Sequence, residues 1–177
     1  SEGNCATVKE MLEKLTTPLI SVVDDMKCNT LHHAVSKNYT LLTSLLLPHI
    51  TDVNSPNRLG STPLHYAAAN GATQCIKILL NHPLIMKNQK DEYGYAPIHL
   101  AVKKNCLETV AELIEGNVDV NVRRPGCGST PLHFAVEIGS RSMVELLLSN
   151  GASFSARDDR KRTPLMKAAE MTSERKE

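Results

Sequence analysis

The sequence predicts an all-α solenoid of stacked helix–turn–helix units, because one short segment recurs at a fixed interval. STPLHYAA at Ser61 returns as YAPIHLAV at Tyr95 and STPLHFAV at Ser129, with weaker copies CNTLHHAV at Cys28 and KRTPLMKAA at Lys161. Aligned on one apolar position, the copies fall at Leu31, Leu64, Ile98, Leu132 and Leu165. Steps of about 33 residues are typical of repeat arrays, in which each unit contacts only its neighbours.

Turn chemistry places two helices in each unit. Thr62 is a suitable cap, Pro63 fits the first turn, where its missing N–H is not needed, and Gly71 suits a left-handed end. TQCIKILLN then carries apolar residues at helical spacing and predicts the second helix. The same template predicts helices near residues 30–37 and 40–47, 97–104 and 107–115, and 131–138 and 141–149. Asn38 and Asn105 take the place of glycine at two turns, because Asn tolerates positive φ best among the other residues.

The array is predicted to hold four full repeats between two halves. We expect a half repeat at 1–28, repeats at 29–61, 62–95, 96–129 and 130–162, and a half repeat at 163–177. GNCATVKEMLEKL from Gly3 is similar to the second half of a repeat, and RTPLMKAAEM from Arg162 to a first half. We therefore expect a fragment of a longer protein, the alternative being degenerate natural caps.

Composition argues against several classes of function. The net charge is +1, from 20 basic and 19 acidic residues, whereas non-specific nucleic-acid binding needs a surplus of Lys and Arg. A local basic patch stays compatible with this balance. No apolar run approaches the roughly 18 residues of a membrane span, and no signal peptide is visible.

The chemistry-bearing residues favour a protein without a cofactor, a metal or a catalytic centre. The five cysteines are odd in number and lack CxxC spacing, so we expect reduced, mostly buried thiols in an intracellular protein. His32, His65, His99 and His133 share one repeat position. Units stack on the order of 10 Å apart, too far for one shared metal. We expect each imidazole to bond its own turn or the neighbouring loop. No GxSxG, P-loop or HExxH motif occurs.

The segments GSTPLHYAAANG, IKILL and MVELLLSNGA resemble the ankyrin-repeat consensus. This resemblance covers nearly the whole chain. It implies L-shaped helix pairs stacked side by side, with β-hairpin-like finger loops projecting from them, and a non-catalytic scaffold for protein–protein contacts. In addition, DVNVRRPGCGSTPLHFAVE at Asp119 looks like repeats of the inhibitor-of-NF-κB branch, over about 20 residues. That match implies a Rel-type transcription factor as partner.

The family resemblance also implies a covalent modification. Asn54 and Asn121, each in an Asp-Val-Asn segment, match the pattern that an asparaginyl hydroxylase modifies in many ankyrin proteins. The structural alternative, which we favour, is that these asparagines brace the loop backbone.

Partners of this family usually lie in the concave groove between the finger tips and the exposed side of the first helices. The residues expected at such positions are Arg58, Leu59, Tyr93, Tyr95, Lys103, Lys104, Arg123, Arg124, Glu137, Ile138, Arg160 and Arg162. Four of these, Leu59, Tyr93, Tyr95 and Ile138, are apolar or aromatic groups at places that the fold leaves wet, and such groups are enriched at interface hot spots. Tyr66 and Phe134 sit at a position that is normally core and are not counted. The basic side chains predict a partner segment with acidic residues near an apolar anchor.

These observations predict an intracellular scaffold, cytoplasmic or nuclear, that binds another protein. Three alternatives are a regulatory module of a larger enzyme such as a kinase or ubiquitin ligase, an inhibitor of a Rel-type factor, and a histone-tail reader. The absence of Trp and the few aromatics argue against the last.

Overall fold

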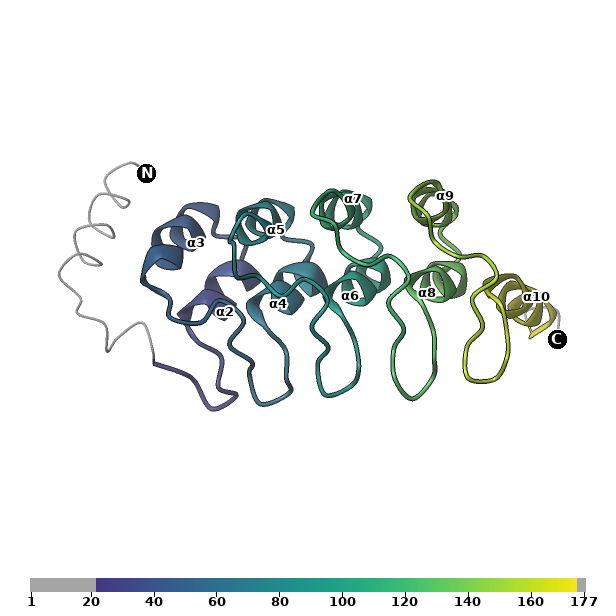
Figure 1. Cartoon of the computed structure of the whole chain (residues 1–177), viewed down its shortest axis with the longest axis horizontal. Helices are drawn as coiled ribbons and strands as arrows, with labels where there is room; N and C mark the ends of the chain where they lie inside the picture. The colour runs from purple at the N-terminus through teal and green to yellow at the C-terminus, as the bar shows by residue number, and fades with distance from the viewer. Residues whose placement is uncertain (1–21, 175–177) are drawn as a thin grey trace.

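The computed structural model describes residues 22–174, with side chains up to Glu170, as a two-layer stack of helices (Figure 1). One row of first helices and a second row above it run along the stack. The helices are α2 (Thr30–Ser36), α3 (Thr40–Leu46), η1 (Leu47–His49), α4 (Pro63–Asn70), α5 (Thr73–Leu80), α6 (Pro97–Lys104), α7 (Leu107–Glu115), α8 (Pro131–Ile138), α9 (Arg141–Ser149) and α10 (Pro164–Glu174). Successive first helices, α2 to α10, pack against one another, and so do α3, α5, α7 and α9. Long finger loops project from the row of first helices. The predicted fold class is confirmed.

The turns between paired helices follow the predicted chemistry. Gly71 and Gly139 end α4 and α8 at φ 72° and 76°, and Asn38 and Asn105 take the same left-handed conformation at φ 55° and 58°. The prediction that Asn replaces Gly at these turns is confirmed. The helix expected near 40–47 is divided into α3 and η1, because Pro48 has no N–H to continue the α-helical bonding.

The four histidines connect neighbouring units, as expected. In His65, Nδ1 lies 3.1 Å from the Thr62 backbone nitrogen at the start of its own helix, and Nε2 lies 2.9 Å from the Tyr95 carbonyl in the next finger. The same bridge joins His32 to Ser61, His99 to Val122 and His133 to Arg162. Burial lowers the pKa of all four, that of His99 to about 4, so the imidazoles are neutral at pH 7.

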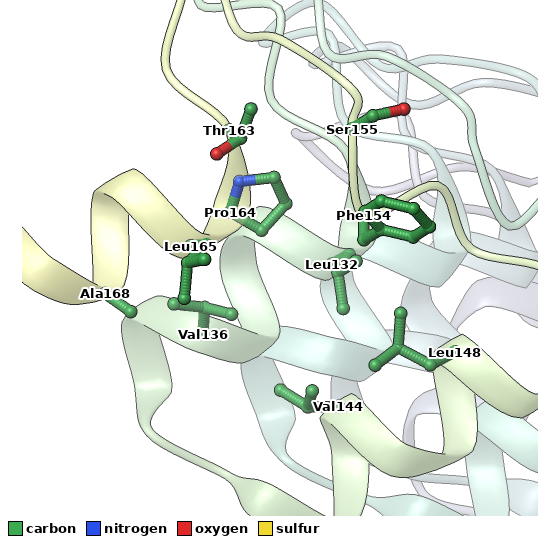
Figure 2. A pocket seen from close by; sticks show the side chains of 10 residues that line it. All are labelled: Leu132, Val136, Val144, Leu148, Phe154, Ser155, Thr163, Pro164, Leu165 and Ala168. Carbon is green, nitrogen blue, oxygen red and sulfur yellow. The ribbon is translucent and has the colours of Figure 1, made fainter.

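The core is a seam of small and branched side chains between the two rows. The repeated apolar position is 0% exposed at Leu31, Leu64 and Ile98 and 2% at Leu132. Leu165 is the exception, 78% exposed at the open end of the stack. There it lines an apolar depression of about 450 Å³ with Val144, Leu148 and Phe154 (Figure 2).

Two local expectations hold only in part. In the loop after α5, Ile85 packs on the core as a cover, but Leu84 and Met86 stay exposed. Cys28 and Cys75 are buried free thiols, whereas Cys106 and Cys127 are half-buried.

The structure covers only part of the predicted half repeats and does not define the predicted repeat boundaries. The second-half segment expected from Gly3 and Cys5 lie outside the described residues. The boundaries between repeats stay a prediction, since helices and fingers do not define where within a finger a unit begins.

Candidate functional site

Four of the five finger turns in the described chain are held by the same short carboxylate or amide. The turns begin at Asp24, Asn57, Asp91, Arg124 and Asp158. In the second finger, Asn57 Oδ1 accepts the backbone N–H groups of Leu59 and Ser61 at 2.9 and 3.0 Å. Equivalent bonds to the residue four positions on occur at Asp24, Asp91 and Asp158. This is the side-chain turn for which Asp and Asn are favoured.

The fourth finger departs from this template at its first residue. Arg124 replaces the Asp or Asn, and its turn closes on Ser129, one residue later than in the other fingers. Gly126 and Gly128 supply positive φ values of 83° and 65° in the longer loop. A side chain that the other turns use to bind their own backbone is here long, cationic and directed elsewhere.

The Arg124 side chain replaces a backbone hydrogen bond that joins neighbouring fingers elsewhere in the stack. In two earlier finger pairs, the residue after the turn start donates its N–H to the preceding finger, as Glu92 does to the Leu59 carbonyl at 3.0 Å. Pro125 occupies that place in the fourth finger and has no N–H. Instead, Arg124 Nε donates to the Tyr93 carbonyl at 2.9 Å. This bond anchors the guanidinium over the third finger.

Two cationic side chains meet on one aromatic ring. The Arg124 guanidinium carbon lies 4.2 Å from the Tyr95 ring centroid, and Lys103 Nζ lies 4.6 Å from it. Lys103 also donates to the Tyr95 hydroxyl at 3.2 Å. Such cation–π contacts are attractive and orient both cations. Tyr95 in turn packs on Phe134, with ring centroids 5.9 Å apart.

These side chains line a depression of about 370 Å³, which we call the Tyr95 pocket. Its lining is Tyr95, Lys103, Arg124, Phe134, Glu137 and Ile138. Five of these six are sequence-predicted site residues that come from the third and fourth fingers and from α6 and α8. Phe134 was left out because its position is normally core. It is indeed buried, at 8% exposed, yet its ring still forms part of the pocket.

The remaining predicted residues lie outside the pocket. Tyr93 is 56% exposed at the tip of the third finger. Arg58, Lys104 and Arg160 are exposed. Leu59, outside the pocket, and Tyr95, within it, are half-buried, so both are less exposed than expected.

Part of the predicted basic surface is neutralised by ion pairs. Arg162 contacts Asp158 and Glu170, each at 2.8 Å, and Arg123 contacts Asp159 at 3.3 Å. Burial opposes ionisation of Asp158, but its bonds from Arg162 hold the pKa of that carboxyl below its usual value. In contrast, Lys103 and Arg124 take part in no ion pair within the described part of the chain. The Tyr95 pocket therefore brings together two cations without an ion-pair partner in the described residues.

Asn54 and Asn121 brace adjacent loops, as the structural alternative predicts. Asn54 donates to the Leu84 carbonyl and accepts the Met86 N–H, both at 2.7 Å. Asn121 donates to the Gly151 carbonyl at 3.0 Å and accepts the Ser153 N–H at 2.7 Å. Their assignment as hydroxylation acceptors stays a prediction.

The described residues also bear on metal binding and on membrane insertion. Among them, no group of three or more His, Cys, Asp or Glu side chains has the arrangement of a metal site. None of the helices placed by the structure has the length and apolarity needed to cross a bilayer.

Similarity to known proteins is consistent along the chain. A family model of ankyrin repeats in three copies matches residues 31–124 and again 98–176. A 42-residue stretch is 44% identical to the mouse ankyrin repeat and LEM domain-containing protein 2, covering 23% of this chain and 4% of that protein. A stretch of 83 residues is 35% identical to the palmitoyltransferase AKR1 of Lachancea kluyveri, covering 46% and 11%. The matches thus span only a small part of these two relatives.

Among solved structures, the ankyrin repeat domain of Bcl-3, a member of the IkappaB family, superposes with a TM-score of 0.88. The two are 27% identical, and the match covers 97% of this chain and 77% of that one. This likeness supports the resemblance to the inhibitor branch noted at Asp119. Together with the match of the family model over most of the sequence, it shows that the chain belongs to the ankyrin-repeat family, whose fold is a non-catalytic scaffold for protein–protein contacts.

Proposed function

We propose that the chain binds a segment of a partner protein along its concave face, with the Tyr95 pocket at the centre of the interface. This proposal rests on the meeting of three unusual side chains at one pocket. Tyr95, Lys103 and Arg124 each depart from the residue that α4 and the finger before it carry at the same place in the repeat, and all three meet at one pocket. The residues at those places are Ser61, Ala69 and Asn57.

Arg124 also holds the third finger through the Tyr93 carbonyl. That bond alone does not require a second cation on the Tyr95 ring, and the gathering of Lys103 and Arg124 there is better explained by a ligand. Tyrosine and arginine side chains dominate the binding energy at protein interfaces. The pocket lies on packed helices and anchored fingers, so little conformational freedom is lost when a partner binds. Ile138, 38% exposed, lines the pocket, and Tyr93, 56% exposed on the third finger, extends the contact surface.

Substitution of the flanking residues tests this function. We expect Tyr93→Ala and Ile138→Ala each to weaken partner binding while lowering the free energy of unfolding by less than about 1 kcal/mol. Partners captured from lysate by the wild type and by Tyr93→Ala/Ile138→Glu are compared by mass spectrometry, then confirmed with the purified partner. Arg141→Ala, on the outer helix α9, is the control. Equal capture by both proteins, or loss of folding together with binding, would contradict the groove assignment.

A second candidate function is inhibition of a Rel-type transcription factor. The likeness to the ankyrin domain of an IkappaB-family protein favours it, as does the sequence from Asp119. In this case the purified chain should displace a Rel homology region from its DNA in a mobility-shift assay. An unchanged shift at saturating chain concentration removes this candidate and leaves the general function in place.

We propose an intracellular location, cytoplasmic or nuclear, on the basis of the cysteine usage and the likeness to IkappaB-family domains. A regulatory module within a larger enzyme stays an alternative. The sequence of the full-length protein would decide it.

A further inference from the structure

We infer that the Tyr95 pocket selects an acidic side chain in the partner segment, together with an aliphatic or aromatic side chain next to it. This inference rests on the function proposed above and adds the chemistry of the partner. It is argued from the charge, the shape and the repeat-to-repeat differences of the pocket.

Charge defines one half of the pocket. Lys103 and Arg124 bring two positive charges to the Tyr95 ring, at 4.6 and 4.2 Å from its centroid. The pocket's carboxylate, that of Glu137, is bound by Lys167 at 2.8 Å. The lining thus holds two cations without a carboxylate partner in the described chain, and a carboxylate is the protein group that best complements them.

The two cations are held in place before a ligand arrives. Arg124 is anchored through Nε on the Tyr93 carbonyl, and its NH1 lies 3.7 Å from the Cys127 sulfur. Lys103 is tied to the Tyr95 hydroxyl. Anchored cations lose less side-chain freedom on binding a carboxylate than mobile surface lysines do.

Apolar surface defines the other half. The Phe134 ring and the Ile138 side chain lie beside Tyr95, and Ile138 is 38% exposed. An aliphatic or aromatic side chain placed here removes apolar surface from water on both partners. A segment with an acidic residue adjacent to such a side chain fills both halves at once, and a purely acidic or purely apolar segment fills only one.

The chain itself supplies the variant that tests this inference. Tyr95→Ser/Lys103→Ala/Arg124→Asn installs the residues that α4 and the finger before it carry at the same places in the repeat. A charge-matched control is Lys77→Ala/Arg141→Ala, which removes two cations from the outer helices α5 and α9. Circular dichroism and urea unfolding establish that both variants fold.

The probe is a library of random dodecapeptides displayed on phage and selected on the immobilised wild-type chain. We expect selected peptides to share an Asp or Glu within two positions of Leu, Ile, Val, Met or Phe. One selected peptide and its version with the acid changed to the amide are then measured by fluorescence anisotropy. The amide version should bind about ten-fold more weakly at about 50 mM salt, with a smaller difference at about 300 mM. The triple variant should lose the same preference, and the control should keep it.

The outcomes separate this inference from the function on which it rests. If selected peptides lack acidic residues but still need Tyr93 and Ile138, the acidic preference is wrong and groove binding stands. If they bind the triple variant as well as the wild type, the pocket is not the site, and both proposals fall.

Discussion

The finger that begins at Asn57 and the finger that begins at Arg124 solve one folding problem in two ways. In the first, a buried side-chain amide holds its own turn through two backbone N–H groups. In the second, the turn is one residue longer, its glycines supply the curvature, and the first side chain reaches across to Tyr93 and Tyr95. The comparison indicates that a position which normally holds a turn can carry a side chain that contacts a ligand, provided that other backbone features, here two glycines, keep the turn folded.

The hydrogen-bond partner of the histidine that precedes each finger also differs at the fourth finger. His32, His65 and His133 reach the carbonyl of the residue that closes the next finger turn. His99, which faces the longer fourth finger, bonds the Val122 carbonyl before the turn, and the Ser129 backbone, which closes the turn, also acts on its pKa. It remains fully buried, and burial gives it a pKa of about 4.

The largest expected effect is a loss of stability in acid through His99. Its folded pKa of about 4 lies below the ordinary value of 6.5, so the folded chain binds fewer protons between these values. The stabilisation is complete above about pH 6.5 and is lost as the pH falls toward 4, amounting to about 3 kcal/mol. Urea unfolding from pH 7 to 4 measures it. Because carboxylates also titrate in this range, the comparison is with His99→Gln, whose pH dependence should be smaller by that amount. Equal slopes would contradict the assignment.

The next effect comes from removing the amide that holds the second finger. Asn57→Ala leaves the Leu59 and Ser61 N–H groups without their acceptor at a part-buried site and removes one of the two partners of the Tyr66 hydroxyl. The free energy of unfolding should fall by about 2–3 kcal/mol. Asn57→Asp keeps the acceptor that Asp91 provides in its own finger and should retain part of this stability. A loss below about 0.5 kcal/mol in Asn57→Ala would show that the turn does not depend on its side chain.

A smaller effect on stability is expected at Arg124. Arg124→Ala removes one hydrogen bond at a half-buried site and should lower the free energy of unfolding by about 1 kcal/mol or less. Arg124→Ala should weaken partner binding much more than the control Arg141→Ala does. If the loss of stability matched that of Asn57→Ala, Arg124 would be a structural residue and the contrast between the fingers would disappear.

The smallest effect concerns the reactivity of the Cys127 thiol, in the longer turn from Arg124 to Ser129. Burial opposes ionisation of Cys127, but hydrogen bonds from Ser129 and the nearby Arg124 guanidinium hold its pKa below the usual value. Arg124→Ala should therefore raise that pKa and slow iodoacetamide alkylation of Cys127 near pH 7 by about two- to three-fold. Mass spectrometry of the labelled peptide follows the rate, with half-buried Cys106 as the internal reference. An unchanged rate would place the guanidinium away from the sulfur.

Sequence reasoning recovered the helices and their turns because the signals are local. Gly71, Asn38 and Asn105 mark the turns because each tolerates the positive φ that the turn requires, independently of the residues packed around it. The five pocket residues found in advance follow from their place in a repeated template. An alignment of the five finger turns would also have marked Arg124, which stands where the others carry Asp or Asn.

What sequence reasoning missed depends on side-chain direction and on neighbours distant in the chain. Phe134 occupies a core position, yet the edge of its ring reaches the pocket because Tyr95 packs beside it. Arg162 was counted as available, but Asp158 and Glu170 bind it. Neither contact can be derived from the repeat period, since the period fixes positions and not rotamers.

The ion pair between Lys167 and Glu137 links the pocket to the end of the stack. Lys167 belongs to α10, which packs on α8 and whose Leu165 is largely exposed. Without this lysine a bare carboxylate would stand at the rim of the cationic pocket. A residue of the next unit therefore sets how much net positive charge the pocket offers to an acidic partner.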